Sequence, residues 1–587
     1  MARHMAVKAE GAAGARAEAL RPAAVIVAVV LSVVRLVLAY LEPVILNMME
    51  GVDVTLMFNE ALYLSRGEWL GPYGQNTLVK NPGYPLFIAA VSKGGRPYQV
   101  AVALVIMAAA ACFVWAIFPL TKRHPWVSVV VYGLIIFTPI LFSRNYMERI
   151  YRTVLAYPMD MLVCTGYIGL YLRRDRGLKA LLPWGVVLAL AMPFFWVLKE
   201  DSVWVLPLAG VVSLLLALHW LVLPKTRRKP AAAVARVVLL CLPLVTTLGM
   251  VSAISHQNMA RYGISVTNEK GGGSFARLSH DLVRIGPGDP NTDIWVSRDA
   301  MQRAIDASPT LAGMGDELMS TYDVWAQDNH PDVGDPRNLY MDLYQWVLMD
   351  AYQQAGGYTT GQETYAFWDR AATELEQAFD DGTLQEREPG LWVSGIVRPI
   401  AWDDVPHQLG ATVRRVFHML FLSPDSERRV SWVNSIGTQE DYDQAVQLFH
   451  GPVVPVEGDR PASQTFALKV AYLATSCHGP LRAAVTVLTL GLLVACIATK
   501  TWRGMAHKGD VLLMVMGLLL VCLEIAFSVS WFMNPASEAS GLLWEALVSY
   551  YVGVMCCYDM AILLIGAWCG SALLARRRAR TSQPAAS

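Results

Sequence analysis

Long apolar segments separated by short polar stretches dominate this chain. A helix that crosses a membrane needs about 20 mostly apolar residues, and such runs recur throughout the sequence. The candidate spans are 23–45, 98–120, 126–142, 154–172, 180–198, 202–223, 232–254, 481–499, 510–532 and 543–574. We therefore expect an all-α polytopic membrane protein with about ten transmembrane helices.

One long segment, residues 255–480, interrupts this pattern because it is polar and reads mainly as helices. Ser297, Thr360 and Thr438 each precede a helical pattern and are typical N-cap residues. The helix expected at 407–422 has spaced apolar positions, which suit either the membrane surface or packing within its own domain. The expected division is a tail (1–22), a seven-span module (23–254) with an external loop (46–97), the helical domain (255–480), further spans (481–575) and a tail (576–587).

Composition and charge support a membrane location and exclude some partners. The chain is 54% hydrophobic and 16% charged, which is too apolar for a soluble protein. Lys plus Arg and Asp plus Glu balance at 48 each, so the charge indicates no nucleic-acid partner. Basic residues gather in alternate short connections, in step with the basic N-terminus. The positive-inside rule therefore predicts a multi-pass protein of the cell membrane with both termini cytoplasmic and residues 255–480 extracytoplasmic.

The loop after the first span contains the first candidate for chemistry. Asp53 follows the span directly, and an amphipathic stretch and the sequence Asn-Pro-Gly-Tyr-Pro at 81–85 come after it. A carboxylate here can act as a general base for an attacking hydroxyl, or it can cap the helix that follows. Glu60 is a second acid in the same helix, and its position favours a solvated face over a supporting role at the site.

Two other external loops carry unexpected charges. Arg144, Arg149 and Arg152 flank Glu148 in a loop that the positive-inside rule expects to be poor in cations. Arginine binds phosphate bidentately, although juxtamembrane arginines also anchor to lipid headgroups. A tight hairpin between aromatic-rich spans holds further charges at 199–201, namely Lys199, Glu200 and Asp201. Lys199 is a candidate phosphate ligand, with Glu200 and Asp201 in supporting roles. The glycine-rich run after Lys270 lacks the context of a phosphate-binding loop, so we expect a flexible loop there.

The first loop resembles that of the GT-C superfamily, the integral-membrane glycosyltransferases that use polyprenyl-phosphate sugars. The resemblance rests on the acid Asp53, the helix after it and the Pro-rich motif at 81–85, and the layout of 23–254 is similar to the shared module of protein O-mannosyltransferases and aminoarabinose transferases. The chain departs from the family pattern because Val54 follows Asp53 and because the aromatic-Pro-Pro motif is replaced. A diverged bacterial subfamily is the expectation.

The resemblance implies an inverting transfer of sugar from a polyprenyl-phosphate donor to a cell-wall glycan, teichoic-acid-like polymer or glycolipid. Asp53 would be the base and the loop cations with Lys199 would hold the phosphate. No cofactor or metal is required in this expectation, although a divalent cation is compatible with it. A transporter or lipid-linked-sugar flippase is the alternative, since the charges Arg35, Asp160, Glu524 and Asp559 lie within apolar spans.

Overall fold

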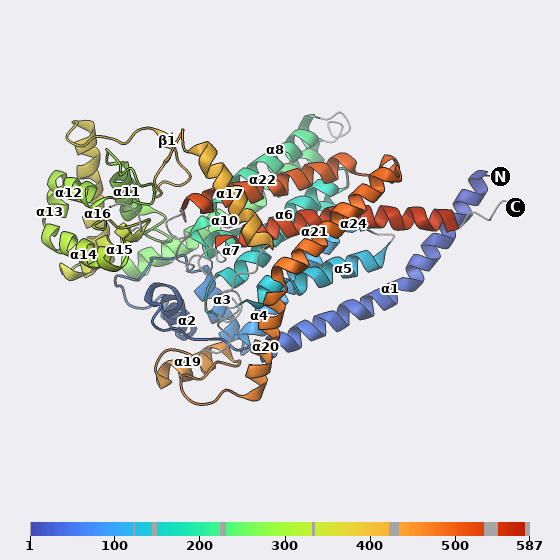
Figure 1. Ribbon diagram of the computed structural model, residues 1–587, viewed down its shortest axis with the longest axis horizontal. Helices are drawn as coiled ribbons and strands as arrows, with labels where there is room; N and C mark the ends of the chain where they lie inside the picture. Colours follow the sequence, from blue (N-terminus) through green and yellow to red (C-terminus); the bar gives the residue numbers. More distant parts are fainter. Residues whose placement is uncertain are drawn as a thin grey trace.

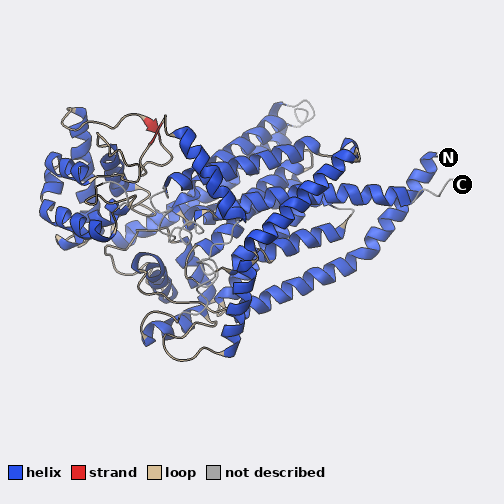
Figure 2. Cartoon of the chain, viewed as in Figure 1, coloured by secondary structure: helices blue, strands red, loops and turns tan. Residues whose placement is uncertain are grey.

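The computed structural model describes residues 2–121, 124–143, 149–222, 230–330, 335–421, 434–532 and 550–581. Helices make up most of this part of the chain. The strands found within it, β1 (Gly390–Leu391) and β2 (Ile400–Ala401), pair as a short antiparallel hairpin. Figures 1 and 2 show a bundle of long helices with a cluster of shorter helices at one end. The expected all-helical architecture is confirmed.

Within the described residues, nine helices are long and apolar enough to cross a membrane, so the chain is a polytopic membrane protein. They are α1 (Ala2–Leu41, apolar from Pro22), α4 (Tyr98–Thr121), α6 (Thr153–Leu172), α7 (Leu178–Leu198), α8 (Val205–Val222, preceded by the 3-10 turn η4, Glu200–Trp204), α10 (Pro230–Tyr262), α21 (His478–Ala498), α22 (Lys508–Phe532) and α24 (Val552–Thr581).

One expected span has a different form. Residues 126–142 contain the 12-residue helix α5 (Pro125–Ile136) and the 3-10 turn η2 (Pro139–Phe142) instead of a single long helix. At about 1.5 Å per residue, α5 alone is too short for a hydrocarbon layer of about 30 Å. Proline at the first position of each element explains the break, because proline starts helices well but ends the one before it. The predicted count of ten full spans is therefore not confirmed.

The bundle is built around α6. Its apolar window is 94% buried, against 17% for α1, and it packs against α4, α7 and α24. Gly169 allows this close packing, since a Cβ atom there would lie 2.1 Å from the ring of Trp184 on α7. Small residues that let helix backbones approach are typical of membrane helix interfaces. The central helix is therefore closely packed against α7 near its C-terminal end.

The cluster of shorter helices forms a second hydrophobic core, with Trp295, Trp368 and Tyr344 fully buried. Its helices are α11 (Gly273–Arg284), α12 (Arg298–Ala307), α13 (Pro309–Ala312), α14 (Gly315–Asp328), α15 (Leu343–Gln354) and α16 (Gly361–Asp380). We call residues 263–404 the polar domain. The caps expected at Ser297 and Thr360 are confirmed, since each hydroxyl accepts a backbone N–H bond. Trp531 of α22 donates to the Arg398 carbonyl at 2.6 Å and joins the domain to the bundle.

Several further elements connect the polar domain to the bundle. They are α17 (Val405–Phe421), α19 (Gln439–Phe449) and α20 (Ala462–Ser476), with α2 (Leu56–Arg66) and α3 (Gly83–Lys93) from the first loop. Thr438 caps α19, as expected, and together with Asp441 it forms a full capping box. Helix α10 extends to Tyr262, past the expected end of its span at residue 254. Residues 543–549 of the last expected span lie outside the described residues.

Candidate active site

Asp53 is positioned by an extended segment that follows α1. The backbone of Val44 pairs with residues 452 and 454, and Met48 N donates to the Ile436 carbonyl at 2.9 Å. A π-helical turn, η1 (Gly51–Thr55), then leads into α2, and Asp53 is its third residue. Such turns are uncommon and occur frequently at functional sites. The segment that fixes Asp53 is thus held by residues almost 400 positions later in the sequence.

The Asp53 carboxylate lies between two cations. It forms an ion pair with Lys80, and its Oδ2 lies 2.8 Å from Nη2 of Arg149. Burial alone would raise its pKa, but Lys80 and Arg149 outweigh burial and lower the pKa of Asp53 to about 2. Thr55 occupies the N-cap of α2, and no side chain caps that helix. The capping alternative for Asp53 is therefore wrong.

Lys80 is a site residue that sequence reasoning missed. It immediately precedes the Asn-Pro-Gly-Tyr-Pro motif, whose position is fixed by the end of α7. The backbone N–H of Asn81 donates to Glu200 Oε1 at 2.7 Å, and a Cβ atom at Gly83 would lie 2.4 Å from the Val197 carbonyl oxygen. Only glycine permits this approach, so the motif places Lys80 beside Asp53. The sequence feature that could have identified Lys80 is its position next to a Pro/Gly motif in the same loop as an acidic residue.

Arg149 and Arg152 stand at the N-terminal end of α6. Arg149 joins Asp53 to Glu50, whose Oε2 is 2.5 Å from Arg149 Nη2. Arg152 is the N-cap residue of α6, and its Nη1 lies 2.5 Å from Glu200 Oε2. The ring of Tyr151 lies under both guanidinium groups, at 4.5 and 5.4 Å from its centroid. The partial positive charge of the helix terminus adds to these cations and favours an anion here.

The remaining predicted residues fall into two groups. Lys199, at the C-cap of α7, has its amine 5.4 Å from the ring centroid of Tyr550, a residue that also interacts electrostatically with Asp53. Glu200 lies in η4 and bridges Arg152 and Asn81. Arg144 and Glu148 lie outside the described residues, and so does the side chain of Asp201.

Glu60 corrects a prediction. Instead of a solvated face it occupies a buried position, with 2% of its surface exposed. Neither carboxyl oxygen has a hydrogen-bond partner among the described residues. Burial, the largest cause, raises the pKa of Glu60 to about 8, while Lys80 and Arg152 partly oppose this and Glu200 adds to it. A neutral carboxyl group therefore faces the charged cluster at pH 7. Helix α2 packs mainly against α3 and to a lesser extent against α19, and the residue pattern within α2 alone does not reveal these contacts.

The polar domain contributes to the same site. Lys270 lies 3.4 Å from Asp342 Oδ2 and 4.1 Å from the ring centroid of Trp346. Burial, the largest cause, lowers its pKa, and the charge of Lys80 acts in the same direction. The side chain of Asn268 meets that of Asn81, at 2.5 Å. The residues just before the glycine-rich run, Asn268 and Lys270, thus pack against the site.

The described charges of the candidate site do not sum to zero. The cations are Lys80, Arg149, Arg152, Lys199 and Lys270. The ionised acids are Glu50, Asp53, Glu200 and Asp342, and Glu60 is neutral at pH 7. Among the described side chains, one positive charge is left over at the border between the bundle and the polar domain. Among the described residues, no group of three or more His, Cys, Asp or Glu could hold a metal ion. The arrangement can accept an anion such as a phosphate beside a carboxylate.

Comparison of the chain with protein-family models, with curated proteins and with solved structures found no match.

Proposed function

We propose that this protein is a membrane glycosyltransferase that moves a sugar from a polyprenyl-phosphate donor to an extracytoplasmic acceptor, with inversion. The observation that carries the proposal is the placement of Asp53 between Lys80 and Arg149 at the N-terminal end of α6. A carboxylate, several cations and a helix N-terminus are what transfer from a phosphate leaving group to a hydroxyl requires. The resemblance of the first loop to GT-C enzymes agrees with this chemistry.

The reaction needs one proton transfer. An acceptor hydroxyl oxygen attacks the anomeric carbon, its proton goes to Asp53, and the bond from that carbon to the phosphate oxygen breaks. The electron pair of that bond stays on the phosphate, which leaves as an anion and needs no general acid. Lys80, Arg149 and Arg152 stabilise the charge that develops on it. Attack opposite the leaving group inverts the anomeric centre.

The low pKa of Asp53 fits this scheme once the donor is bound. A phosphate that takes hydrogen bonds from Lys80 and Arg149 shares their charge and brings its own negative charge near Asp53. Both effects raise the pKa of Asp53 and make it a stronger base. Donor binding would thus activate the carboxylate, and an empty site would keep it in ion pairs.

The acceptor side is the polar domain, which borders the site through Lys270 and Asp342. The Lys/Arg bias predicts that this domain lies outside the cell and that both termini are cytoplasmic. Helix α1 begins and α24 ends at the same end of the molecule, away from the polar domain (Figure 1), which agrees with termini on one side of the membrane and the domain on the other. A cell-wall glycan, a teichoic-acid-like polymer or a glycolipid is accessible from that side.

The transporter or flippase alternative has less support. Arg35 lies 4.0 Å from Glu42 and over the ring of Phe142, and Asp559 is held by Arg482. The Arg482 contact joins α21 to α24, and Glu42 at the end of α1 is the ionic partner of Arg35, so both of these intramembrane charges have structural partners. No described contact favours movement of a substrate across the bundle.

The test is sugar release from undecaprenyl- and decaprenyl-phosphate sugars by the purified protein in liposomes. Asp53→Asn removes the base and keeps the size, so we expect a rate loss of about 10²–10⁴-fold. Glu50→Gln is the matched control, because Glu50 also binds Arg149, and we expect it to lose less than tenfold. Equal activity of Asp53→Asn and wild type would remove Asp53 from the mechanism. Donor translocation without sugar release would favour a flippase.

A further inference from the structure

Helix α17 has one buried and one exposed apolar face. Gln408, Ala411, Thr412, Arg415, Met419 and Leu420 are buried. On the opposite side, Leu409, Val413 and Phe417 follow one another at four-residue spacing and are 43%, 58% and 57% exposed. Large apolar side chains in such a row are rarely left in water, and they mark a contact surface.

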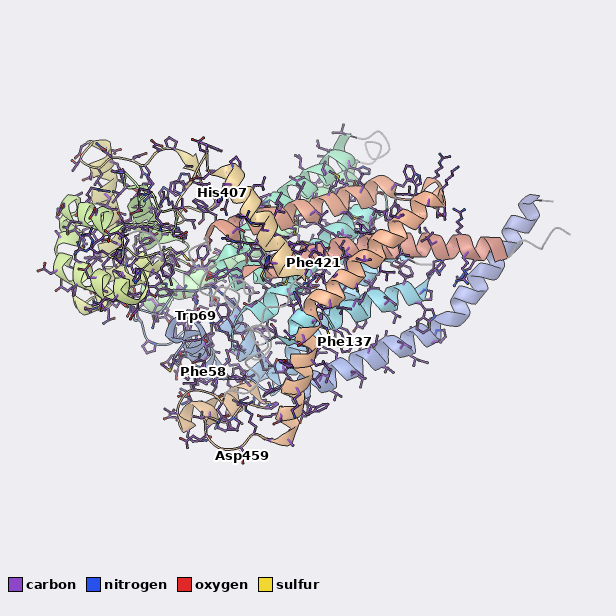
Figure 3. The ribbon with its side chains drawn as sticks, viewed as in Figure 1. Phe58, Trp69, Phe137, His407, Phe421 and Asp459 are labelled. Carbon is purple, nitrogen blue, oxygen red and sulfur yellow. The ribbon has the colours of Figure 1, made fainter. Side chains whose placement is uncertain are left out.

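The buried face of α17 crosses the ends of three membrane spans. Arg415 donates to the Ser530 carbonyl near the end of α22, and His478 at the start of α21 donates to the Met419 carbonyl at 3.0 Å. The Phe421 ring lies 5.9 Å from that of Tyr558 in the second turn of α24. Figure 3 shows α17 running from His407, near the polar domain, to Phe421 over the bundle. The helix therefore lies where the bundle meets the polar domain.

We propose that Leu409, Val413 and Phe417 insert into the hydrocarbon of the bilayer, so that α17 is an interfacial membrane helix. Exposed apolar side chains also occur on the two spans whose ends α17 crosses, where Leu488 of α21 and Leu520 of α22 are both 63% exposed. Helices that lie in the membrane interface bury one apolar face and keep their charges at headgroup level. The inference does not depend on the proposed enzymatic function.

The charged residues and the length of α17 limit how deeply it can insert into the bilayer. Arg414 and His418 are exposed and lie one position after Val413 and Phe417, so they stand beside the apolar stripe. A guanidinium at this place reaches phospholipid headgroups and cannot lie in the hydrocarbon without cost. With 17 residues, α17 is also shorter than the roughly 20 residues that a spanning helix needs. Shallow insertion satisfies both observations.

The experiment places a fluorescent unnatural amino acid at Val413 in the full chain, which avoids labelling the nine native cysteines. The protein is reconstituted in phosphatidylcholine vesicles with and without lipids that carry a nitroxide on the acyl chain. Leu488 in α21 is the lipid-facing control, and Val324 in α14 of the polar domain, which is 60% exposed, is the aqueous control. Probes at Leu409 and Phe417 repeat the test if the Val413 variant folds poorly.

We expect the Val413 probe to emit at short wavelength and to lose at least half of its intensity to the nitroxide lipid, as the Leu488 probe does. The Val324 probe should be quenched by soluble iodide and not by the lipid. The proposal is overturned if the Val413 probe behaves like the Val324 probe. It is also overturned if a photocrosslinker at Val413 joins to a second copy of the chain or to another protein instead of to lipid.

Discussion

Two arginine–carboxylate clusters in this molecule differ in how their charges are paired. Asp559 of α24 accepts both of its ionic bonds from Arg482 of α21, at 2.8 and 3.0 Å. Asp53 is held by Lys80 and Arg149 from two different loops, with further cations nearby. Among the described residues, Asp559 has one cationic partner and also accepts a hydrogen bond from Tyr157, whereas the second cluster has more cations than ionised acids. We call the first the closed pair and the second the open cluster. A cluster with excess charge can exchange an internal partner for a ligand, and a closed pair cannot do so without loss.

The two clusters also differ in how much of their carboxylate side chains is exposed to solvent. The side chains of Asp559 and Arg482 are 13% and 6% exposed, and they lie among membrane spans. Asp53 has 31% of its side chain exposed and lies at the border of the polar domain. A buried pair that joins two helices contributes mainly to structure. A partly exposed carboxylate among cations has access to substrate, so the two acids should respond differently to the same substitution.

The largest expected effect on stability comes from breaking the closed pair. Asp559→Asn leaves the Arg482 charge buried and uncompensated, which should cost about 3–5 kcal/mol of unfolding free energy. Denaturant unfolding of the purified protein in detergent measures this loss. Sugar release per folded molecule should stay within about threefold of wild type. Adding Arg482→Gln should recover part of the lost stability, and a double variant less stable than Asp559→Asn would contradict the closed-pair interpretation.

The sequence indicated much of the fold because long apolar runs and N-caps are local features. The caps at Ser297, Thr360 and Thr438 lie directly before their helices, and most spans appear as single helices. The prediction of a single span at 126–142 was wrong because Pro139 ends one helical segment and starts another. Apolarity alone does not reveal such a break in the helix.

The site was harder to predict, since its residues come from separate loops. Arg149 and Arg152 drew attention as charges in an unexpected loop, and both lie near Asp53, whereas Lys199 lies against the ring of Tyr550. Lys80 was missed because the docking of residues 81–83 on the end of α7, which depends on tertiary structure, brings it there. Burial of Glu60 likewise requires other elements to cover its helix. The pattern of apolar residues along α2 does not predict that Glu60 is buried.

Loss of a cation from the open cluster should have the next largest effect. Lys80→Met removes a partner of Asp53 and a proposed phosphate ligand, so the donor KM should rise or the rate should fall by tenfold or more, about 1.4 kcal/mol. Arg149→Gln and Arg152→Gln should each act in the same direction. The matched control is Lys93→Met at the exposed end of α3, which should match wild type. If all three site variants match wild type at equal expression, the cations are lipid anchors only.

The smallest expected effect on activity at pH 7 is that of Glu60, whose effect on stability depends on pH. Its carboxyl has a pKa of about 8 in the folded protein and 4.5 in its ordinary state, so the folded state binds the extra proton between these values. Stability from this group therefore falls as pH rises from about 4.5 to 8, and the loss is constant above 8. Glu60→Gln stays neutral throughout and avoids the loss. Its melting temperature should exceed that of wild type by a margin that grows from pH 5 to pH 8 and then levels.

The same substitution sharpens the comparison of the two clusters. Above pH 8, an ionised Glu60 cancels the excess positive charge of the open cluster, so wild-type donor affinity should fall several-fold while Glu60→Gln retains it. Glu68→Gln, an exposed acid in the same loop, should show neither the pH-dependent margin in melting temperature nor the retained affinity. Thermal melts and donor titrations at pH 5, 6.5, 8 and 9 measure both quantities. A margin that does not change with pH would mean that Glu60 is ionised in the folded protein at neutral pH, and the open cluster would then have no excess charge.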